Sequence, residues 1–289
     1  MLRAMDSAVA GLRAHQNKMD VVGHNIANVN TFGFKAQTYT FKEAMYQTST
    51  ASTGGSAASG GTNAAQYGYG TLMGSIGMDM TSSTPSYVGG FNATIDGEGF
   101  FITSNESGKK VAANGDIKGE NFSYTRVGQF MVDSNGYIVD ANKNFIYGYR
   151  PGSDELVALR IPKSVDTNGS PTFSDTVTDD VLLSTAVEIN ALGKITVTVQ
   201  VDKAGAAGEK ESKTVEIGQV AVATFQNPNG LTKAGGNYYT TNENDNAGQA
   251  AAGKPGDPGT ASLMTGYIEA SNVDLAKEFA DMITTHRGF

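Results

Sequence analysis

The residues of this chain best suited to bind a transition metal are three histidines, His15, His24 and His286. No two of them have the spacing of a His-x-x-x-His helix motif, and no cluster of carboxylates lies beside them in the sequence. The chain contains no cysteine, which excludes thiolate catalysis, disulfides and cysteine-ligated zinc. We therefore interpret the histidines as ordinary helix-face residues and expect no bound metal.

Asp96 and Glu98 are two neighbouring carboxylates, which are the residue types that form the catalytic acid pair of a glycoside hydrolase. Gly97 and Gly99 alternate with them, and a tight turn accounts for all four residue types. No further acid that could complete a catalytic pair is evident nearby. We therefore interpret this segment as a structural turn.

Two further segments resemble ligand-binding loops. Residues 68–74 have the glycines of a dinucleotide-binding loop, but the spacing is wrong and the flanking strand and helix are missing. Residues 242–253 resemble a calcium loop, but Ala247 replaces the glycine and Gly253 replaces the final glutamate that such a loop needs. The sequence therefore predicts neither an enzyme nor a bound cofactor.

The charge and hydropathy of the chain exclude other classes of function. The 289 residues include 21 Lys and Arg against 29 Asp and Glu, a formal net charge of −8. The longest basic run is Lys109-Lys110, whereas nucleic-acid binding needs clustered cations that displace counterions from phosphates. No run of about 18 apolar residues occurs, so we expect no membrane insertion. Asp6 and Arg13 interrupt any apolar N-terminal run, so we expect no Sec-type signal peptide.

Both ends of the chain predict helices. Apolar residues recur at three- and four-residue spacings from Leu2 to Ile26, which is the a/d seam of a helix that packs on another helix. The Asn- and Gly-rich segment 25–33 is expected to end this helix. Asp274 favours the start of a second helix, whose apolar residues recur in the same way up to Phe289. Because that pattern stops without a C-cap, we expect the natural helix to be longer.

The middle of the chain, about residues 85–241, predicts β-strands. Strict alternation of β-branched residues in 195–201 and 220–224 indicates strands with one buried and one solvated face. The segment Asp133-Ser134-Asn135-Gly136 predicts a hairpin. No alternation of strands and helices is visible. We therefore predict a mainly β fold with α-helical termini, in which an antiparallel sandwich- or barrel-like domain accompanies a helical coiled-coil domain.

The domain organisation follows from these patterns and from two polar segments of low complexity, residues 47–66 and 242–259. We predict a terminal helical domain, an extended Gly/Ser/Thr-rich connecting segment and a β-rich domain. Residues 151–217 either fold within the β-rich domain or form a reduced outer lobe. The predicted boundaries are 1–34 and 268–289 for the terminal domain, 35–84 for the connecting segment, and 85–267 for the β-rich domain.

Arg126 lies in a predicted strand, next to Tyr124 and Thr125. Three interpretations are open for its side chain. It pairs with a carboxylate and fixes the domain, it remains solvated on the strand, or it contributes to a contact between subunits. The sequence alone does not choose among them.

Five motifs in order along the chain resemble the signatures of the axial proteins of the bacterial flagellum, which are the rod and hook subunits. The first motif contains Asn-Ile-Ala-Asn followed by Asn-Thr and Gly-Phe-Lys. The second is a central Asp-Gly turn and the third is the strand that follows it. The last two motifs lie near the C-terminus. The motifs are Leu12 to Lys35, Asp96 to Phe101, Tyr124 to Phe130, Gly266 to Asp274, and Met282 to Phe289.

The resemblance covers the whole chain except residues 151–217, which are generic. Two residues depart from the family pattern, because His24 and His286 stand where Asn and Gln are more usual. The C-terminal helix of the family also commonly continues past the last residue of this sequence, which agrees with the missing C-cap.

The resemblance implies a structural subunit of the flagellar hook, which assembles into a helical tube and acts as a flexible universal joint between motor and filament. The Gly-rich residues 60–76 resemble the hook version more than the distal-rod version. A distal-rod (drive-shaft) subunit of the basal body is the alternative. A carbohydrate-binding or hydrolytic β domain with helical tails is a remote alternative, and the absence of Trp argues against it.

The resemblance also implies partners and a location. The partners are further copies of this chain, the other axial proteins (rod, hook cap and hook–filament junction) and the flagellar export apparatus. Family members are exported unfolded without a cleaved signal peptide, which places the chain in the extracellular hook or the basal body.

The residues implied by the resemblance and by the apolar seam fall into two groups. The first group, expected at contacts between subunits, is Leu2, Met5, Val9, Leu12, Met19, Val22, Asn25, Ile26, Asn28, Asn30, Thr31, Gly33, Phe34, Leu275, Phe279 and Met282. The second group, expected in the structural turn, is Asp96, Gly97, Gly99, Phe100, Phe101 and Arg126.

Overall fold

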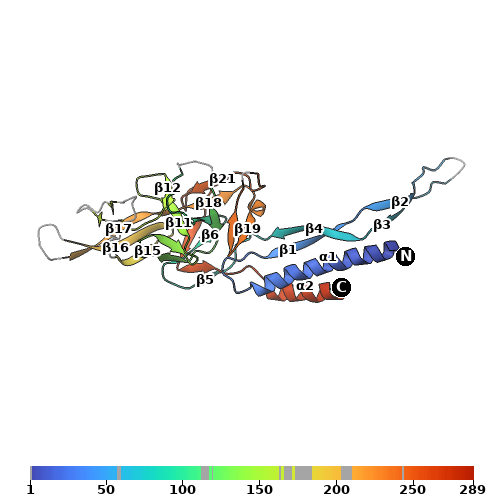
Figure 1. Cartoon of the computed structure of the whole chain (residues 1–289), viewed down its shortest axis with the longest axis horizontal. Helices are drawn as coiled ribbons and strands as arrows, with labels where there is room; N and C mark the ends of the chain where they lie inside the picture. The colour runs from blue at the N-terminus through green and yellow to red at the C-terminus, as the bar shows by residue number, and fades with distance from the viewer. Residues whose placement is uncertain are drawn as a thin grey trace. The chain divides into compact units, whose positions relative to one another are not determined.

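The structure is a computed structural model that describes residues 2–56, 60–111, 117–118, 120–162, 164–165, 171–172, 184–202, 210–242 and 244–289. The chain divides into two compact units (Figure 1). The terminal unit comprises Met1–Asn30, Lys35–Asp79 and Asn272–Phe289, and the β unit comprises Thr31–Phe34 and Met80–Ser271.

Two antiparallel helices, α1 (Leu2–Ala27) and α2 (Leu275–Gly288), form one part of the terminal unit (Figure 1). Their direction is shown by the hydrogen bond between Asn25, near the end of α1, and Glu278, in the first turns of α2. The carboxylate of Asp274 caps α2 by accepting two backbone N–H groups of its first turn. The helices predicted at the two ends of the sequence are confirmed.

The rest of the terminal unit is a two-stranded antiparallel ribbon. In it β1 pairs with β4 and β2 pairs with β3, and α1 packs against β1 and β4. The structure therefore has paired strands within residues 35–84, where the sequence suggested only an extended connection. Aromatic residues such as Tyr39 and Phe41 give this segment the β propensity that its Ser- and Gly-rich part lacks. The ribbon strands are β1 (Gln37–Glu43), β2 (Tyr46–Thr50), β3 (Ala65–Gly68) and β4 (Thr71–Met78).

The β unit is built on a 13-stranded sheet with the main order β15-β16-β17-β11-β7-β8-β20-β19, to which β9, β10, β12, β18 and β21 are also paired. Three smaller pairs, β22–β6, β23–β5 and β13–β14, complete the described strands. All of these pairings are antiparallel, and the described sheet does not close into a barrel. The predicted mainly antiparallel β fold with helical termini is confirmed.

The elements of the β unit have the following bounds: β5 (Pro85–Tyr87), β6 (Ala93–Asp96), β7 (Phe100–Ser104), β8 (Ser123–Thr125), β9 (Phe130–Val132), β10 (Ile138–Asp140), β11 (Phe145–Tyr149), β12 (Leu156–Ala158), β13 (Ser164–Val165), β14 (Pro171–Thr172), β15 (Ser184–Ile189), β16 (Lys194–Asp202), β17 (Lys210–Val220), β18 (Val222–Phe225), η1 (Pro228–Gly230), β19 (Thr232–Gly235), β20 (Tyr238–Thr240), β21 (Ala250–Gly253), β22 (Ser262–Thr265) and β23 (Tyr267–Glu269).

The β unit has a continuous hydrophobic core. As the alternation predicted, Ile195, Val197 and Val199 of β16 are buried while the residues between them are partly exposed. The central strand β7 differs, because all five of its residues are buried. Successive side chains of a strand point to opposite faces, so both faces of β7 are covered, and its edges pair with β8, β11 and β18. The other core residues are Ala93, Ile95, Phe101, Phe130, Ile138, Ile146, Leu159, Ile161, Val215, Ile217, Val220, Val222 and Leu263.

Local predictions within the β unit are also tested by the strand register. The predicted hairpin forms, because β9 pairs with β10 across the turn at 133–136. Within residues 151–217, β12 pairs directly with β11, and β15 and β16 join the main sheet through β17, whereas β13 and β14 pair with each other in a separate sheet. The prediction of an outer lobe also falls on residues 163, 166–170, 173–183 and 203–209, which lie outside the described residues.

Among the helices of the described residues, none is long and apolar enough to cross a membrane.

Candidate assembly surface

The apolar seam of α1 lies largely on an exposed face of the helix. Met5, Val9 and Leu12 are all exposed, and Leu12 shows 42% of its surface. Met19 and Ile26 are partly buried and Val22 is buried, while the side chain of Leu2 lies outside the described residues. The buried face of α1 comprises Ala14, Val21, Val22 and Asn25, and of these only Val22 belongs to the apolar seam.

Helix α2 repeats this arrangement. Its predicted apolar residues Leu275 and Phe279 are exposed, as is Ile283, and Met282 is partly buried. The buried residues of α2 are instead Glu278 and Thr285. Exposed side chains of this size normally mark an interaction surface when they gather on one element. The intersubunit role assigned to these residues from the sequence stays a prediction that their exposure supports.

The ribbon adds exposed apolar residues that the sequence analysis missed. Their signature is present in the sequence, since aromatic and aliphatic residues recur on both sides of the low-complexity segment. A two-stranded ribbon is marginally stable by itself, so these side chains are available for contacts beyond the chain. The exposed residues are Phe41, Met45, Tyr46, Tyr67, Tyr69, Leu72, Met73 and Ile76.

Asn25 holds the terminal unit together from within. Its side chain is 1% exposed, and its Nδ2 donates to the backbone oxygen of Gln37 at 2.8 Å and to Oε1 of Glu278 at 3.0 Å. Its Oδ1 accepts the backbone N–H of Gln37 at 2.9 Å. One amide therefore joins the end of α1, the start of β1 and the first turns of α2. The structure thus gives Asn25 internal contacts, where the sequence suggested contacts between subunits.

Burial also affects the ionisation of Glu278. Desolvation raises the pKa of this carboxyl above its ordinary value, and the hydrogen bond from Asn25 works in the opposite direction. Glu278 is not among the residues that the sequence patterns identify. The sequence shows only an acidic residue that directly precedes Phe279 in the first turns of the predicted helix.

The remaining motif residues after α1 divide between the units. Asn28 donates its Nδ2 to the backbone oxygen of His24 at 2.9 Å, which stabilises the last turn of α1. Asn30 is exposed and Thr31 is partly buried. Gly33 and Phe34 are buried in the β unit, although the sequence placed them in the terminal helical domain.

The segment Thr31–Phe34 is anchored in the β unit by its backbone and its rings. The backbone N–H of Gly33 donates to the oxygen of Glu269 at 2.8 Å. Gly33 has a φ of +68°, and a Cβ atom at this position would lie only 2.7 Å from the side chain of Val127. A residue with a side chain would be strained there. The ammonium of Lys233 lies 4.6 Å from the ring centroid of Phe34.

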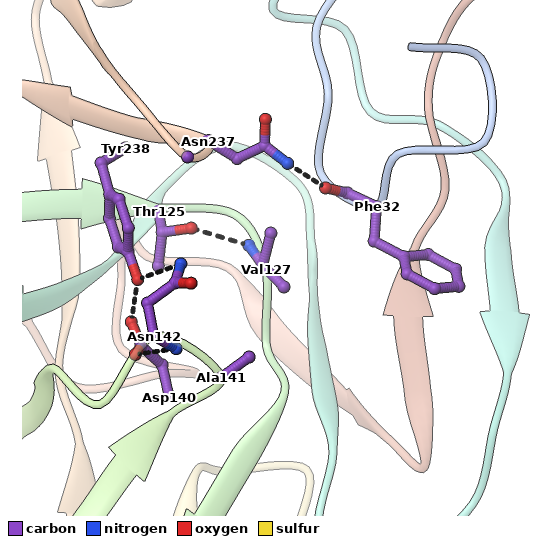
Figure 2. A pocket seen from close by; sticks show the side chains of 9 residues that line it. Phe32, Thr125, Val127, Asp140, Ala141, Asn142, Asn237 and Tyr238 are labelled. Carbon is purple, nitrogen blue, oxygen red and sulfur yellow. Dashed lines mark hydrogen bonds between the residues drawn. The ribbon is translucent and has the colours of Figure 1, made fainter.

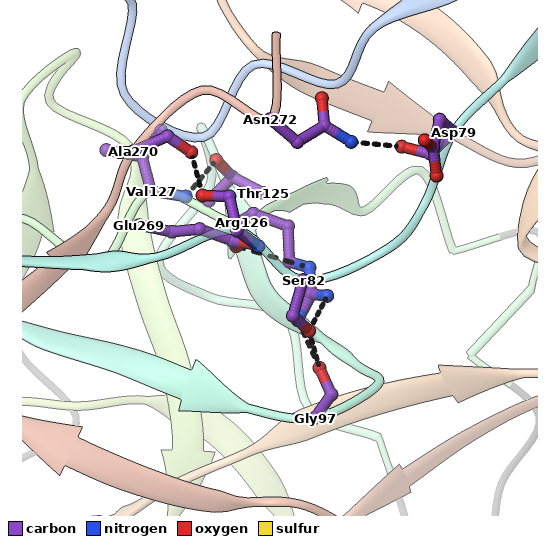
Figure 3. Close-up of polar contacts among 10 residues, drawn as sticks. Asp79, Ser82, Gly97, Thr125, Arg126, Val127, Glu269, Ala270 and Asn272 are labelled. Atoms are coloured by element: carbon purple, nitrogen blue, oxygen red, sulfur yellow. Dashed lines mark hydrogen bonds and ion pairs between the residues drawn. The ribbon is translucent and has the colours of Figure 1, made fainter. Parts of the chain in front are cut away.

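The predicted turn forms around a buried ion pair (Figure 3). Nε of Arg126 lies 3.5 Å from Oε2 of Glu269, and both side chains are 2% exposed. Nη1 of Arg126 also donates to the backbone oxygen of Gly97 at 2.7 Å, and Nη2 contacts Oγ of Ser82 at 3.4 Å. Of the three interpretations of Arg126, the structure shows the pairing with a carboxylate. The solvated interpretation is wrong, because the side chain is 2% exposed.

The other turn residues surround this pair. The guanidinium of Arg126 lies 5.5 Å from the ring centroid of Phe100, and Phe101 is fully buried in the core. Gly99 has a φ of +142°, and a Cβ atom there would lie 2.4 Å from Val222, so a side chain does not fit. Asp96 is exposed and Gly97 supplies the carbonyl that Arg126 binds. Burial lowers the pKa of Arg126, and the charge of Glu269 opposes that shift.

Asn272 also joins separate segments of the terminal unit, and the sequence did not reveal its contacts. Its Oδ1 accepts the backbone N–H of Ala36 at 2.7 Å, and its Nδ2 donates to the backbone oxygen of Asp79 at 2.8 Å (Figure 3). Asp79 in turn donates its backbone N–H to the oxygen of Ala36 at 2.9 Å. Three separate parts of the chain therefore meet at this one amide.

A cavity of about 190 Å³ in the β unit is lined by Phe32, Asp140, Asn142 and Tyr238, among other residues (Figure 2). The Asp140 carboxylate accepts the hydroxyl of Tyr238 and the backbone N–H of Asn142, so it is already used within the unit. Burial raises the pKa of Tyr238 to about 12. The ring of Phe32 points away from this polar group (Figure 2). The arrangement stabilises the turn after β10 and offers no reactive group.

Metal-binding side chains do not gather in the part of the chain that the structure describes, where no cluster of three or more His, Asp or Glu residues occurs. His15 instead packs against the ring of Phe41, with centroids 5.2 Å apart. His286 is exposed on α2.

Comparison with known proteins identifies the family. Residues 5–35 match the family model described as flagella basal body rod protein, and residues 264–289 match the model described as flagellar basal body rod FlgEFG protein C-terminal. The flagellar basal-body rod protein FlgG of Bacillus subtilis (strain 168) is 35% identical over 291 residues, which cover 100% of this chain and 92% of that protein. The chain belongs to the flagellar rod and hook protein family. This is a family of structural axial proteins and not of enzymes.

Further relatives come from both branches of the family. The flagellar basal-body rod protein FlgG of Borreliella burgdorferi is 27% identical over 294 residues, which cover 100% of this chain and 91% of that protein. The flagellar hook protein FlgE of the same organism is 25% identical over 441 residues, which cover 100% of this chain and 95% of that protein.

Proposed function

We propose that this chain is a distal-rod subunit of the flagellar basal body, which assembles with copies of itself into a helical tube and serves as a drive shaft. The observation that carries the proposal is the exposed apolar surface of the terminal unit. Seam residues of both helices stay exposed although each helix already packs within the unit.

The physical argument for assembly concerns what those side chains need. A large aliphatic or aromatic side chain gains roughly 1.5–3 kcal/mol when it moves from water into an apolar contact. Neighbouring copies in a helical array would cover the stripes of Met5, Val9 and Leu12 and of Phe279 and Ile283. A contact of this kind that joins two different surfaces and does not close produces a filament or tube.

The comparisons favour the rod over the hook, although the sequence analysis favours the hook. The alignments with the two FlgG rod proteins run over 291 and 294 positions for a chain of 289 residues, so they need few insertions. The alignment with the FlgE hook protein runs over 441 positions, so that protein carries long segments without a counterpart here. The resemblance of residues 60–76 to a hook segment does not outweigh this difference. A hook subunit remains the second candidate.

The proposal includes partners and a location. The first partner is a further copy of this chain. The adjoining rod and hook proteins would contact the two ends of the assembly. Passage through the flagellar export apparatus without a cleaved signal peptide is expected for an axial subunit, and the basal body is the expected location.

Electron microscopy of the purified chain under polymerising conditions tests the proposal. Straight tubes are the expected product, whereas curved or supercoiled tubes would favour the hook. A genetic test separates the candidates again, since the gene should restore motility in a bacterium that lacks its rod subunit and not in one that lacks its hook subunit. A chain that stays monomeric at all concentrations and restores neither strain would overturn both candidates.

A further inference from the structure

Strand β15 lies at one end of the main sheet and pairs, among the described strands, with β16 alone. Directly after it, the backbone N–H of Asn190 donates to the oxygen of Lys194 in β16 at 3.0 Å. Bonded and non-bonded pairs alternate along an antiparallel ladder. Glu188 therefore bonds to β16 as well, whereas Val187 and Ile189 direct their N–H and C=O groups outward. In the described part of the chain, no hydrogen bond reaches these outward groups.

The same edge is covered one step further along the chain. Ala191 is the next residue that directs its groups outward, and its oxygen accepts the N–H of Leu263 in β22 at 2.9 Å. Strand β22 itself pairs with β6 and not with β15. The edge is therefore closed beside Ala191 and open beside Val187 and Ile189.

A hollow of about 540 Å³ lies along the open part of the edge. It is lined by β15 together with β5, the end of β22 and the glycines beside them. Phe91, Val187 and Ile189 line it and are partly buried against the hydrophobic core, so the hollow has an apolar side. Tyr87 also lines it and is 72% exposed. Of the described residues that line it, Glu188 is the only one with a charge.

An open sheet edge beside an apolar hollow can accept an added strand. The residues of that strand that bond to Val187 and Ile189 would point their side chains to the same face as these two, into the hollow. Aromatic and β-branched side chains are favourable there, because they pair well across strands. The residue between them would lie opposite Glu188 and should not be acidic. The expected occupant is therefore an uncharged strand with an aromatic residue.

Strand β2 of the ribbon meets these requirements. It pairs with β3 alone among the described strands, and all of its residues are exposed. The backbone N–H of Tyr69 donates to the oxygen of Met45 at 3.1 Å. By the same alternation, Tyr46 and Thr48 direct their backbone groups away from β3. No charged residue occurs within residues 44–78, and a two-stranded ribbon gains stability from a further strand.

We infer that the outer edge of β15 binds strand β2 of a second copy of this chain. The inference rests on the proposed assembly and deepens it by naming a contact of the β unit. An antiparallel arrangement, as in the other strand pairs, would set Tyr46 opposite Ile189 and Thr48 opposite Val187. The contact joins two different surfaces, so it can repeat from copy to copy without closing.

A second β15 edge is a less suitable occupant of the hollow. Two such edges would pair about a two-fold axis, in which Val187 of each copy bonds to Ile189 of the other. That register places the two Glu188 carboxylates directly opposite each other, which is unfavourable. With β2 in this position, Gln47 lies opposite Glu188 instead, and its amide can donate to the carboxylate. Charge therefore favours β2.

The absence of cysteine makes a direct test practical. Gln47 and Glu188 would form a non-hydrogen-bonded pair, in which the Cα atoms are about 4.5 Å apart and a disulfide fits. Gln47→Cys and Glu188→Cys variants are mixed, assembled and oxidised, and a disulfide between the two kinds of copy is expected. Thr48→Cys with Glu188→Cys is the matched control. A shift by one residue turns the side chain to the other face, so this pair should give about tenfold less disulfide.

Amide exchange tests the same edge without any substitution. In the monomer, the amides of Val187 and Ile189 should exchange rapidly, whereas the amide of Glu188 is protected by its bond to β16. In assembled tubes, the exchange of Val187 and Ile189 should slow by about tenfold or more. Glu188 is the control within the same strand, because its partner does not change.

A peptide with the sequence of residues 44–50 separates this inference from the proposed assembly. Added to the monomeric full chain, it should slow the exchange of the Val187 and Ile189 amides. The same peptide N-methylated at Tyr46 and Thr48 lacks the outward N–H groups and should bind about tenfold more weakly. Val187→Pro removes an outward N–H from the chain and leaves the bonds to β16, so it should weaken binding of the unmodified peptide as well.

The inference is overturned if Val187 and Ile189 are as protected as Glu188 in the monomer, because the edge is then covered within one copy. It is equally overturned if tubes form while these two amides stay unprotected, or if the control cysteine pair cross-links equally well. If no tubes form, the proposed assembly fails and the peptide decides the inference. A peptide that does not bind, or that binds equally well when N-methylated, overturns it.

Discussion

The β unit and the terminal unit use their large apolar residues in opposite ways. In the β unit, side chains from many strands meet in one core, and Phe101 is 0% exposed. In the terminal unit, comparable side chains on α1, α2 and the ribbon face outward, and Phe279 is 49% exposed. The interior of the terminal unit instead combines a few smaller apolar side chains, such as Val21 and Val22, with polar contacts from Asn25, Asn272 and Glu278.

This difference separates the two tasks of an axial subunit. The β unit has a continuous buried apolar core, so we expect it to be stable in a single copy. The terminal unit positions two helices and a ribbon with hydrogen bonds, which specify geometry but add only about 0.5–1.5 kcal/mol each to net stability. Its apolar surface thus remains available for other copies.

The largest effect is expected when a charge is placed on the exposed seam of α1. Leu12→Asp should abolish tube formation, because an unpaired carboxylate in a helix contact must be desolvated at a cost of several kcal/mol in every copy. The melting temperature of the β unit should not change. Electron microscopy and circular dichroism of the same preparation measure the two outcomes.

The matched control for this change is Asn17→Asp, which adds the same charge at an exposed polar position of α1. It should leave assembly nearly intact. Tubes of normal length from Leu12→Asp would show that the seam is not an assembly contact. A collapse of the β-unit melt would show that the two units unfold as one.

A pair of identical substitutions compares the two units directly. Phe101→Ala should destabilise the β unit by about 3–5 kcal/mol, because it opens a cavity in a packed core. Phe279→Ala should change monomer stability by only about 0.5 kcal/mol, as for most exposed positions, yet weaken assembly. Urea denaturation of the monomer measures the first effect and the critical concentration for polymerisation measures the second. Equal losses of monomer stability would contradict the comparison.

Sequence patterns predicted the fold better than they predicted which surfaces meet. The spacing from Leu2 to Ile26 located α1, and alternation located β16, because periodicity follows directly from helix and strand geometry. The same spacing did not reveal that Ala14 and Val21 form the buried face. A stripe of apolar residues looks alike whether its partner belongs to the same chain or to a neighbouring copy.

Polar partners that lie far apart in the sequence could not be predicted for a related reason. A carboxylate partner is one of three interpretations that the sequence leaves open for Arg126, and Glu269 lies in a strand near the other end of the chain. Asn272 is recognisable in the sequence only as part of a helix start, although its amide binds Ala36 and Asp79. A single sequence gives residue types and spacing, whereas such contacts depend on how distant segments return to one place.

A smaller loss is expected from the polar interior of the terminal unit. Asn25→Ala removes three hydrogen bonds and leaves buried partners unsatisfied, at a cost of about 1–3 kcal/mol for each buried group. Amide exchange in α2 should therefore accelerate, while exchange in β16 and β17 stays slow. Asn28→Ala is the control, since the contacts of its amide with His24 lie within the last turn of α1. Unchanged exchange in α2 would show that Asn25 does not hold that helix.

The smallest effect concerns the ionisation of Glu278. Because burial raises the pKa of this carboxyl in the folded unit, its protonated form favours the docked state of α2. The resulting contribution to stability is present below the ordinary glutamate pKa and is lost as the pH rises through the raised value. Protection of α2 amides, corrected for intrinsic exchange rates, should accordingly increase as the pH falls into that interval.

Glu278→Gln isolates this contribution from the other charges near the helix, which are Lys18, Lys277 and Asp281. The glutamine keeps an oxygen that can accept from Asn25 and removes the buried charge, so α2 should be better protected at neutral pH and should lose the pH dependence assigned to Glu278. Asp281→Asn is the matched control, because it breaks the 3.5 Å pair with Lys18 and should reduce protection instead. If Glu278→Gln lowers protection at neutral pH, then the ionised carboxylate stabilises the helix pair and the polar interior of the terminal unit works by charge as well as by hydrogen bonding.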